Sequence, residues 1–188
     1  MSGIIGGEGS RSGILKRYAE GALLKSHVFY QASDVALAND ATMTTFKTFA
    51  YSPNGGNINQ TSIYAWLHLW IDAFASDPSG GNTHKGRKTL QIIITGDDIT
   101  NIDYTITETC GPYLYDTSDE NRLRTPLRWM QGVPAVVLDG TGNADLTYTF
   151  KMANEVADAG VGWNVRGNNT FAESYVLVQE FQQSLAEN

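Results

Sequence analysis

The chain has 188 residues and a net charge of −7, and hydrophobic residues make up 41% of it. This length favours one domain with its own core, although two small domains would also fit. The acidic charge is spread along the chain, which argues against nucleic acid as a partner, because phosphate-backbone binding needs concentrated Lys and Arg. Cys110 is the only cysteine, so no disulfide can form within the chain.

Targeting and membrane signals are missing from the sequence pattern. The N-terminal part is rich in glycine and lacks the continuous apolar stretch of a secretory signal. No apolar run reaches the roughly 18–20 residues that a membrane-spanning helix needs. We therefore expect synthesis in a cytoplasm and no membrane partner.

Residues 1–14 contain five glycines, which leave too much backbone entropy for an independent helix or strand. Their apolar side chains are Ile4, Ile5 and Ile14. Two interpretations remain open: a disordered terminus, or an arm that becomes ordered when these isoleucines dock onto a partner. Glycines in this segment do not predict a phosphate-binding loop, since no strand precedes them and no Gly-Lys-Ser/Thr follows.

The next segment, Leu15–Lys25, carries basic charge and would fit one or two helical turns, although Gly21 interrupts it. We place the domain boundary just after it. Residues 1–27 are the expected N-terminal arm and connector, and residues 28–188 the expected jelly-roll domain.

The central element of the chain is Thr61–Phe74, which we predict to be a strand, although a buried helix would also fit so apolar a run. Alternation puts an aliphatic set on one face, namely Ile63, Ala65, Leu67, Leu69, Ile71 and Ala73. The other face is aromatic and consists of Tyr64, Trp66, His68, Trp70 and Phe74. Such a face is seldom left in water, so a second sheet, a ligand or another copy of the chain should cover it.

The remaining pattern is also one of strands separated by turns. Further strands are expected at Val28–Tyr30, Thr42–Tyr51, Leu90–Thr95, Asn101–Thr107, Val133–Leu138, Leu146–Met152 and Ser174–Phe181. Loops or turns are expected at Asp34–Asp40, Ser76–Lys88, Cys110–Arg128 and Glu155–Asn169. About seven to nine strands without a long helix predict an all-β fold, an antiparallel jelly roll or β-sandwich with a Gly-rich extended N-terminal arm.

Two stretches of the chain resemble known proteins. Residues Ala144–Met152 and Thr170–Phe181 are similar to the closing strands of trimeric C1q/TNF-like jelly-roll domains found on phage virions. The opening residues 1–14 resemble a leader at the start of phage structural proteins. Together they imply a homotrimeric virion surface protein, either a capsid decoration (cement) protein or a tail fibre or knob module.

The resemblance also implies partners and roles. The trimer interface would be formed by Tyr64, Trp66, His68 and Trp70, and the particle would be bound through Ile4, Ile5 and Ile14. The expected partners are two further copies and the major capsid protein or tail proteins, with a host-surface glycan for a tail fibre. The absence of heptads and repeats, which a fibre shaft would show, favours capsid decoration. The expected location is the virion surface, and the family brings no catalytic residues.

The sequence contains few residue patterns that would support catalysis or metal binding. His27, His68 and His84 have no partner at metal-ligand spacing, and Cys110 has no adjacent histidine to activate it. Hence we expect no enzyme activity, no cofactor and no resident metal. Three options stay open. One is a cation at Asp97–Asp98 or Asp116–Glu120, although the EF-hand spacing is absent, and another is a sugar stacked on Trp129 or Trp163. The third is a pair of carboxylates for glycoside cleavage, because such partners meet only in the fold. For the two tryptophans, the alternative is burial in the core.

Overall fold

The fold is known from a computed structural model that describes residues 23–38, 40–53, 61–75, 84–97, 99–113, 125–138, 145–154, 161–167 and 174–182. Within these ranges the chain forms ten strands and no helix. They are β1 (Leu23–Tyr30), β2 (Val35–Leu37), β3 (Thr44–Tyr51), β4 (Thr61–Ala75), β5 (His84–Thr95), β6 (Ile102–Tyr113), β7 (Thr125–Leu138), β8 (Leu146–Asn154), β9 (Val161–Val165) and β10 (Tyr175–Gln182).

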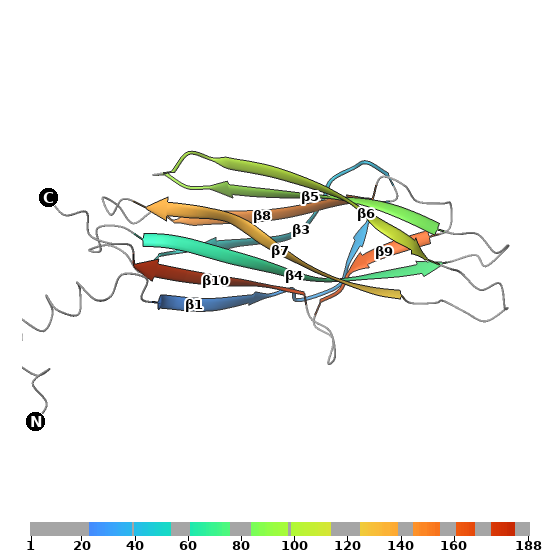
Figure 1. Ribbon diagram of the computed structural model, residues 1–188, viewed down its shortest axis with the longest axis horizontal. Coiled ribbons are helices and arrows are strands. Elements are labelled where there is room, and N and C mark those ends of the chain that lie inside the picture. Colours follow the sequence, from blue (N-terminus) through green and yellow to red (C-terminus); the bar gives the residue numbers. More distant parts are fainter. Residues whose placement is uncertain are drawn as a thin grey trace, which may run out of the picture.

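The strands pair as one long hairpin that has been rolled up. β1 pairs with β10, β2 with β9, β3 with β8, β4 with β7 and β5 with β6, and every pair is antiparallel. Rolling the hairpin distributes the strands over two stacked sheets (Figure 1). Six strands form one sheet, in the order β1-β10-β4-β9-β2 with β7 paired to β4, and β3-β8-β5-β6 form the other. Nested pairs in two packed sheets make a jelly roll, so the predicted fold class is confirmed.

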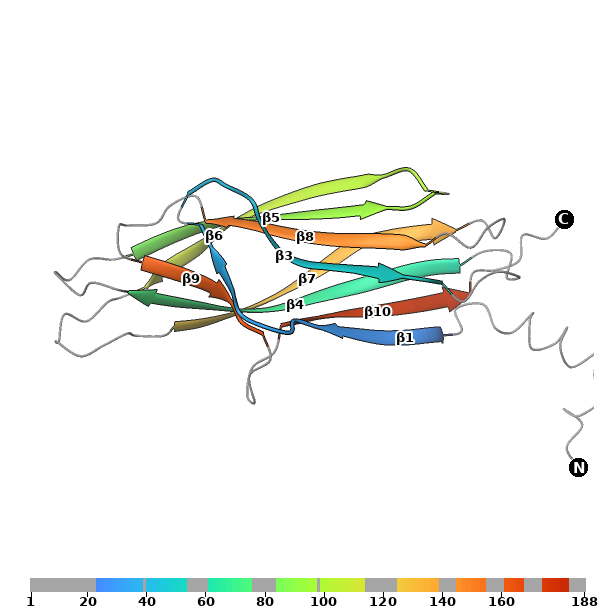
Figure 2. The same ribbon diagram turned by 180° about the vertical axis from the view of Figure 1, so that it is seen from behind.

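β4 is the organising strand of the six-stranded sheet, as the sequence predicted. One of its edges pairs with β7, while the other pairs first with β10 and then with β9 (Figure 2). At the change of partner, the Trp70 amide donates to Ser174 Oγ at 2.9 Å, and the Trp70 carbonyl accepts from the Arg166 amide at 2.8 Å. Trp70 has no strand partner on this edge of β4. These two hydrogen bonds therefore satisfy its backbone amide and carbonyl in place of the bonds that a neighbouring strand would make.

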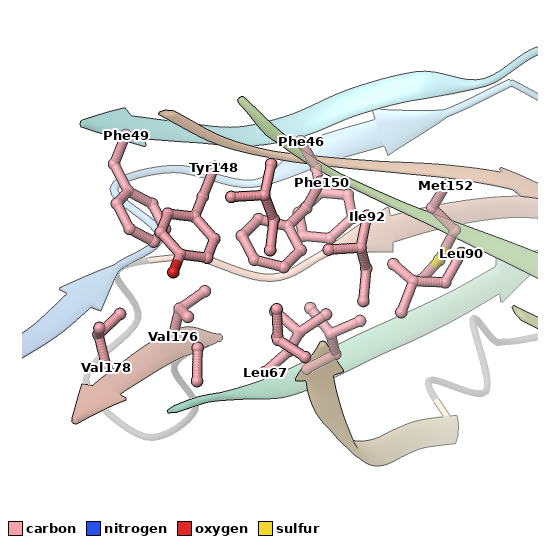
Figure 3. Close-up of a cluster of buried hydrophobic side chains, with 14 of the residues drawn as sticks. Phe46, Phe49, Leu67, Leu90, Ile92, Tyr148, Phe150, Met152, Val176 and Val178 are labelled. Atoms are coloured by element: carbon pink, nitrogen blue, oxygen red, sulfur yellow. The ribbon is translucent and has the colours of Figure 1, made fainter. Parts of the chain in front are cut away.

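The core lies between the two sheets, and the aliphatic face of β4 forms its floor. Leu67 packs with Val176 and Val178 of the same sheet beneath aromatic side chains of the four-stranded sheet (Figure 3). Phe49 stacks on Tyr148 of the same sheet, with ring centroids 5.2 Å apart, and on Phe29 of β1 in the other sheet, with ring centroids 3.8 Å apart. Because Thr61–Ala75 is a strand, the alternative prediction of a buried helix at Thr61–Phe74 is wrong.

Several predicted boundaries were wrong. The first strand begins at Leu23 rather than Val28, so Leu23–Lys25 is not helical and residues 23–27 belong to the sheet. Predicted loops also contain strands, namely β2, β9, the start of β5, the end of β6 and the start of β7. The anchoring residues Ile4, Ile5 and Ile14 lie outside the described residues. None of the described segments contains a helix long and apolar enough to cross a membrane.

Candidate interaction face

The outward side of the six-stranded sheet carries the aromatic residues that the sequence singled out on β4. Strand register places them in rows across four strands. One row is Tyr30, Tyr175, His68 and Met130, and the next is Val28, Leu177, Trp66 and Gly132. A third row brings Gln179 beside Tyr64, and a fourth brings Leu23 beside Phe181 and Ser62 beside Val137. We call these residues the aromatic face.

Large apolar side chains on this face are open to water. Among the described residues, seven large hydrophobic side chains are exposed, and six of them lie here: Leu23, Tyr30, Tyr64, Trp66, Met130 and Val137. Trp66 is 42% exposed and Met130 62%. Scattered apolar side chains are normal on a protein surface, but a contiguous group of this kind marks a binding site.

Ring contacts hold the aromatic face in a defined shape. His68 stacks on Tyr175 with centroids 4.4 Å apart and planes 14° apart, and Tyr64 meets Phe181 edge-on at 5.7 Å. Trp66 lies across Gly132, where an added Cβ would be 3.6 Å from the indole ring. The indole therefore covers β7 at ordinary contact distance, and with the ring contacts this gives the face a defined shape.

The four rows of the aromatic face contain no Asp, Glu, Lys or Arg, although the chain is acidic. Its other outward residues, Ser26, Ser62 and Gln179, are neutral, and no side chain described on the face carries a full charge. Burial lowers the pKa of His68 below its ordinary value, so the imidazole is neutral at physiological pH. Beyond the four rows, Arg128 on β7 is the register partner of Trp70, and Asp72 stands two residues after Trp70 on β4.

The outward side of the four-stranded sheet has the opposite character. It is lined by Thr45, Thr48, Thr89, Thr95, Thr105, Thr107, Thr147 and Thr149. Polar contacts run across it: Gln91 Nε2 donates to Asp103 Oδ1 at 2.8 Å, and the hydroxyls of Thr89 and Thr107 lie 3.2 Å apart. A polar outer side is what an antiparallel sheet presents to water.

All four predicted interface residues thus lie on one face, with Trp70 at the point where β4 changes partner. The sequence did not identify the neighbours that widen the face, among them Tyr30, Tyr175, Met130 and Val137. The alternation in Ser174–Phe181 contained the signal, because Tyr175, Leu177 and Phe181 share a side, but pairing with β4 was not visible from it. The interpretation that a second sheet covers these aromatic side chains is wrong, because the four-stranded sheet packs on the aliphatic side of β4.

The other candidate residues do not form a site. Trp129 and Trp163 are 8% and 2% exposed and belong to the core, so neither can stack on a sugar as it stands. Within the described ranges, no group of three or more His, Cys, Asp or Glu side chains could hold a metal ion. Of the two acidic turns, Asp97 is exposed, and Asp116–Glu120 lies outside the described residues.

Fold and face together define a jelly-roll β-sandwich with an aromatic face whose four described rows contain no charged residue. No protein-family model and no curated protein matches the sequence. Weak similarity exists to the structure of infectious bursal disease virus Gt strain, with a TM-score of 0.36 and 12% identity over 86% of this chain and 38% of that one. Dimeric latent PorU from Porphyromonas gingivalis gives 0.36 and 12% over 88% of this chain and 14% of that one.

The VP2 subviral particle of infectious bursal disease virus gives a TM-score of 0.30 and 11% identity, over 85% of this chain and 38% of that one. The chain thus spans less than half the length of each of these chains. Overlaps this weak say nothing about what the chain does, and a viral and a bacterial protein match it equally well.

Proposed function

We propose that the protein is a non-enzymatic virion structural protein, a homotrimeric decoration (cement) protein that attaches to a phage capsid through its N-terminal arm. The observation that carries the proposal is the aromatic face, four rows of neutral and largely apolar residues on an acidic molecule. Its partner in the proposal is the same face of two further copies. Each copy turns its six-stranded sheet toward the trimer axis and its threonine-lined sheet toward water.

Electrostatics supports another copy of the chain as the occupant of the face. Copies that each carry a net charge of −7 repel one another wherever their charged surfaces meet. The aromatic face brings no described charge into contact, so it is the side on which like-charged copies can approach. Interface cores are enriched in Tyr, Trp, Phe and Met and depleted of charge, which matches the composition of this face.

The number of copies and the location come from the resemblance of Ala144–Met152, Thr170–Phe181 and residues 1–14 to phage virion proteins. The nested strand pairing is the jelly roll that this resemblance implies. We infer from it three copies, a capsid protein as the surface that receives them, and a location on the outside of the virion after synthesis in the host cytoplasm. Nucleic acid, membrane and cofactor have no part in the proposal.

The alternative is a tail fibre or knob that binds a host-surface glycan. Its two candidate residues for stacking on a sugar, Trp129 and Trp163, are buried. A map of the intact particle separates the alternatives, since a decoration protein occupies the capsid lattice and a fibre module occupies the tail.

The test of the interface compares two exposed aromatics with the same substitution. Trp66 on the aromatic face is 42% exposed and Tyr104 on the four-stranded sheet is 45% exposed. Light scattering on the full chain should give three chain masses for the wild type. Trp66→Ala should weaken association by about 2 kcal/mol or more, roughly thirtyfold, because it removes a central interface aromatic. Tyr104→Ala should leave the trimer intact.

Both variants should keep the wild-type circular dichroism spectrum, since neither side chain belongs to the core. A wild type that remains a monomer at working concentration rejects the trimer. If that monomer binds oligosaccharides on an array and Trp66→Ala abolishes the binding, the aromatic face is a glycan site.

A further inference from the structure

Two buried polar residues face each other on the two central strands of the four-stranded sheet, where β8 ends. Lys88 on β5 is the register partner of Asn154 on β8, and both are 0% exposed. On each strand they lie two residues from the buried pair Leu90 and Met152. Because side chains alternate between the two sides of a sheet, Lys88 and Asn154 also point inward. A lysine and a carboxamide directly opposite each other in a core are unusual, since both residue types are normally found in water.

Trp163 covers this pair from the other sheet, and the carboxamide is unsatisfied. Lys88 Nζ lies 3.1 Å from the centroid of the Trp163 ring, which approaches from β9 of the other sheet. Neither the nitrogen nor the oxygen of the Asn154 side chain has a hydrogen-bond partner. Buried polar groups are nearly always paired, so an unpaired carboxamide beside an amine needs an explanation.

We propose that Lys88 and Asn154 are joined by an intramolecular isopeptide bond that forms after folding. The lone pair of Lys88 Nζ attacks Cγ of Asn154, a new C–N bond forms, and the bond from Cγ to Nδ2 breaks. One proton of the amine passes to the departing nitrogen, which leaves as ammonia. The exchange of one amide for another needs no oxidant, reductant or cofactor.

Position in the sheet favours this reaction over a simple polar contact. Side chains directly opposite each other in an antiparallel pair have Cβ atoms about 4.5–5.5 Å apart, well within the length of a lysine side chain. Removal from water favours the neutral amine, which is the nucleophilic form. Proton transfer requires an acid–base group, and Glu108 is the register partner of Lys88 on its other neighbour, β6. The row thus reads Asn154, Lys88, Glu108 across three strands.

The same two strands provide a matched control. Gln91 on β5 is the register partner of Lys151 on β8, so a second carboxamide and amine stand directly opposite each other. This pair belongs to the outward, partly exposed side, and Gln91 Nε2 donates instead to both carboxylate oxygens of Asp103. This pair stands on the water-facing side of the sheet, outside the buried row that contains Lys88, so it should not react.

The test is mass spectrometry of the denatured full-length protein. The wild type should be lighter than its sequence by the mass of one ammonia, and a tryptic digest should contain a branched peptide that joins Lys88 to Asn154. Lys151→Arg should keep both signatures. Asn154→Ala and Lys88→Arg should remove both, and Glu108→Gln should slow or abolish the reaction.

A folded wild type with the full sequence mass overturns the proposal. Loss of ammonia without the branched peptide overturns it too, because succinimide formation at a step such as Asn54–Gly55 also releases ammonia. Both outcomes can be read from the wild type alone, so the result does not depend on whether the core variants fold. It is also independent of the trimer and of the virion.

Discussion

Gly167 lies where two backbones approach too closely for a side chain. A Cβ at this position would overlap the backbone of Ser33. The contact is fixed from both sides, because the Gly167 amide donates to Asp34 Oδ1 at 2.8 Å and Arg166 Nη1 lies 3.0 Å from Asp34 Oδ2. The turn after β9 is thereby clamped to the turn before β2.

Gly167→Ala should lower the free energy of unfolding by about 1–3 kcal/mol, because backbone atoms cannot move aside as a flexible side chain can. The matched control is Gly132→Ala, whose Cβ would meet the Trp66 ring at an ordinary 3.6 Å. Urea unfolding followed by tryptophan fluorescence gives both values. Equal midpoints for Gly167→Ala and the wild type would show that the clamp yields without strain.

The sequence did not identify Gly167, because Arg-Gly-Asn-Asn looks like any polar turn. What makes it special is a contact with Ser33, far away in the chain, and no local pattern records such a contact. Lys88 was missed for a similar reason: it ends a run of polar residues that looks like a loop. Its inward position follows only from its pairing with Asn154 and Glu108.

Some strands can be predicted from their own residues, whereas others form only because of the strands with which they pair. β4, β8 and β10 were predicted with nearly correct bounds, because long alternation separates a buried from an exposed side. β2 and β9 are short, and their strand conformation depends on pairing with each other and with the end of β4. Strand propensity is weak and depends on context, so such elements appear only when the partner is known.

The aromatic face also gives the proposed trimer a pH dependence through His68. Burial lowers the pKa of this imidazole, and a trimer interface would bury it further and lower the pKa more. A lowered pKa means that the buried state binds the proton less tightly than the exposed state does. Stability from the neutral imidazole is therefore present above the ordinary pKa of about 6.5 and is lost as the pH falls through the lowered value.

We expect the trimer to dissociate more readily at about pH 5 than at about pH 7.5, and His68→Gln to reduce this difference. Sedimentation velocity at the two pH values measures it, with Tyr104→Ala as a variant that should behave like the wild type. The same pH dependence in His68→Gln as in the wild type would assign the effect to other groups.

At the scale of the whole molecule, periodicity reveals which side of a strand is buried but not which strands are neighbours. The pattern therefore predicted two-sided strands and an antiparallel sandwich, whereas the nested pairing of β1 with β10 through β5 with β6 emerged only from the structure. For the same reason, the sequence did not predict that Trp129 and Trp163 are buried. Trp129 and Trp163 stood in segments that looked like loops, and their place in the core follows from β7 and β9 pairing with β4.

This pairing bears on how the proposed trimer attaches to a particle. Leu23 at the start of β1 lies beside Phe181 near the end of β10, at one end of the sandwich. In a trimer around a threefold axis, three arms would emerge together at that end. Ordering an arm costs on the order of 1–2 kcal/mol per residue, and burying an isoleucine contributes about 1.5–3 kcal/mol, so one arm alone should bind weakly. Three arms on one rigid trimer gain a factor of about 10²–10⁴ from avidity.

Trimer formation and attachment should therefore be separable. Deleting residues 1–14 should leave a trimer of the expected mass that no longer adds to particles lacking the protein, as measured by occupancy in electron micrographs. A variant that replaces only Ile4, Ile5 and Ile14 by serine keeps the length and glycine content of the arm. It should fail in the same way, because the isoleucines supply the binding energy. Full occupancy by the truncated trimer would place attachment on the jelly roll itself, and binding by the serine variant alone would assign it to the backbone of the arm.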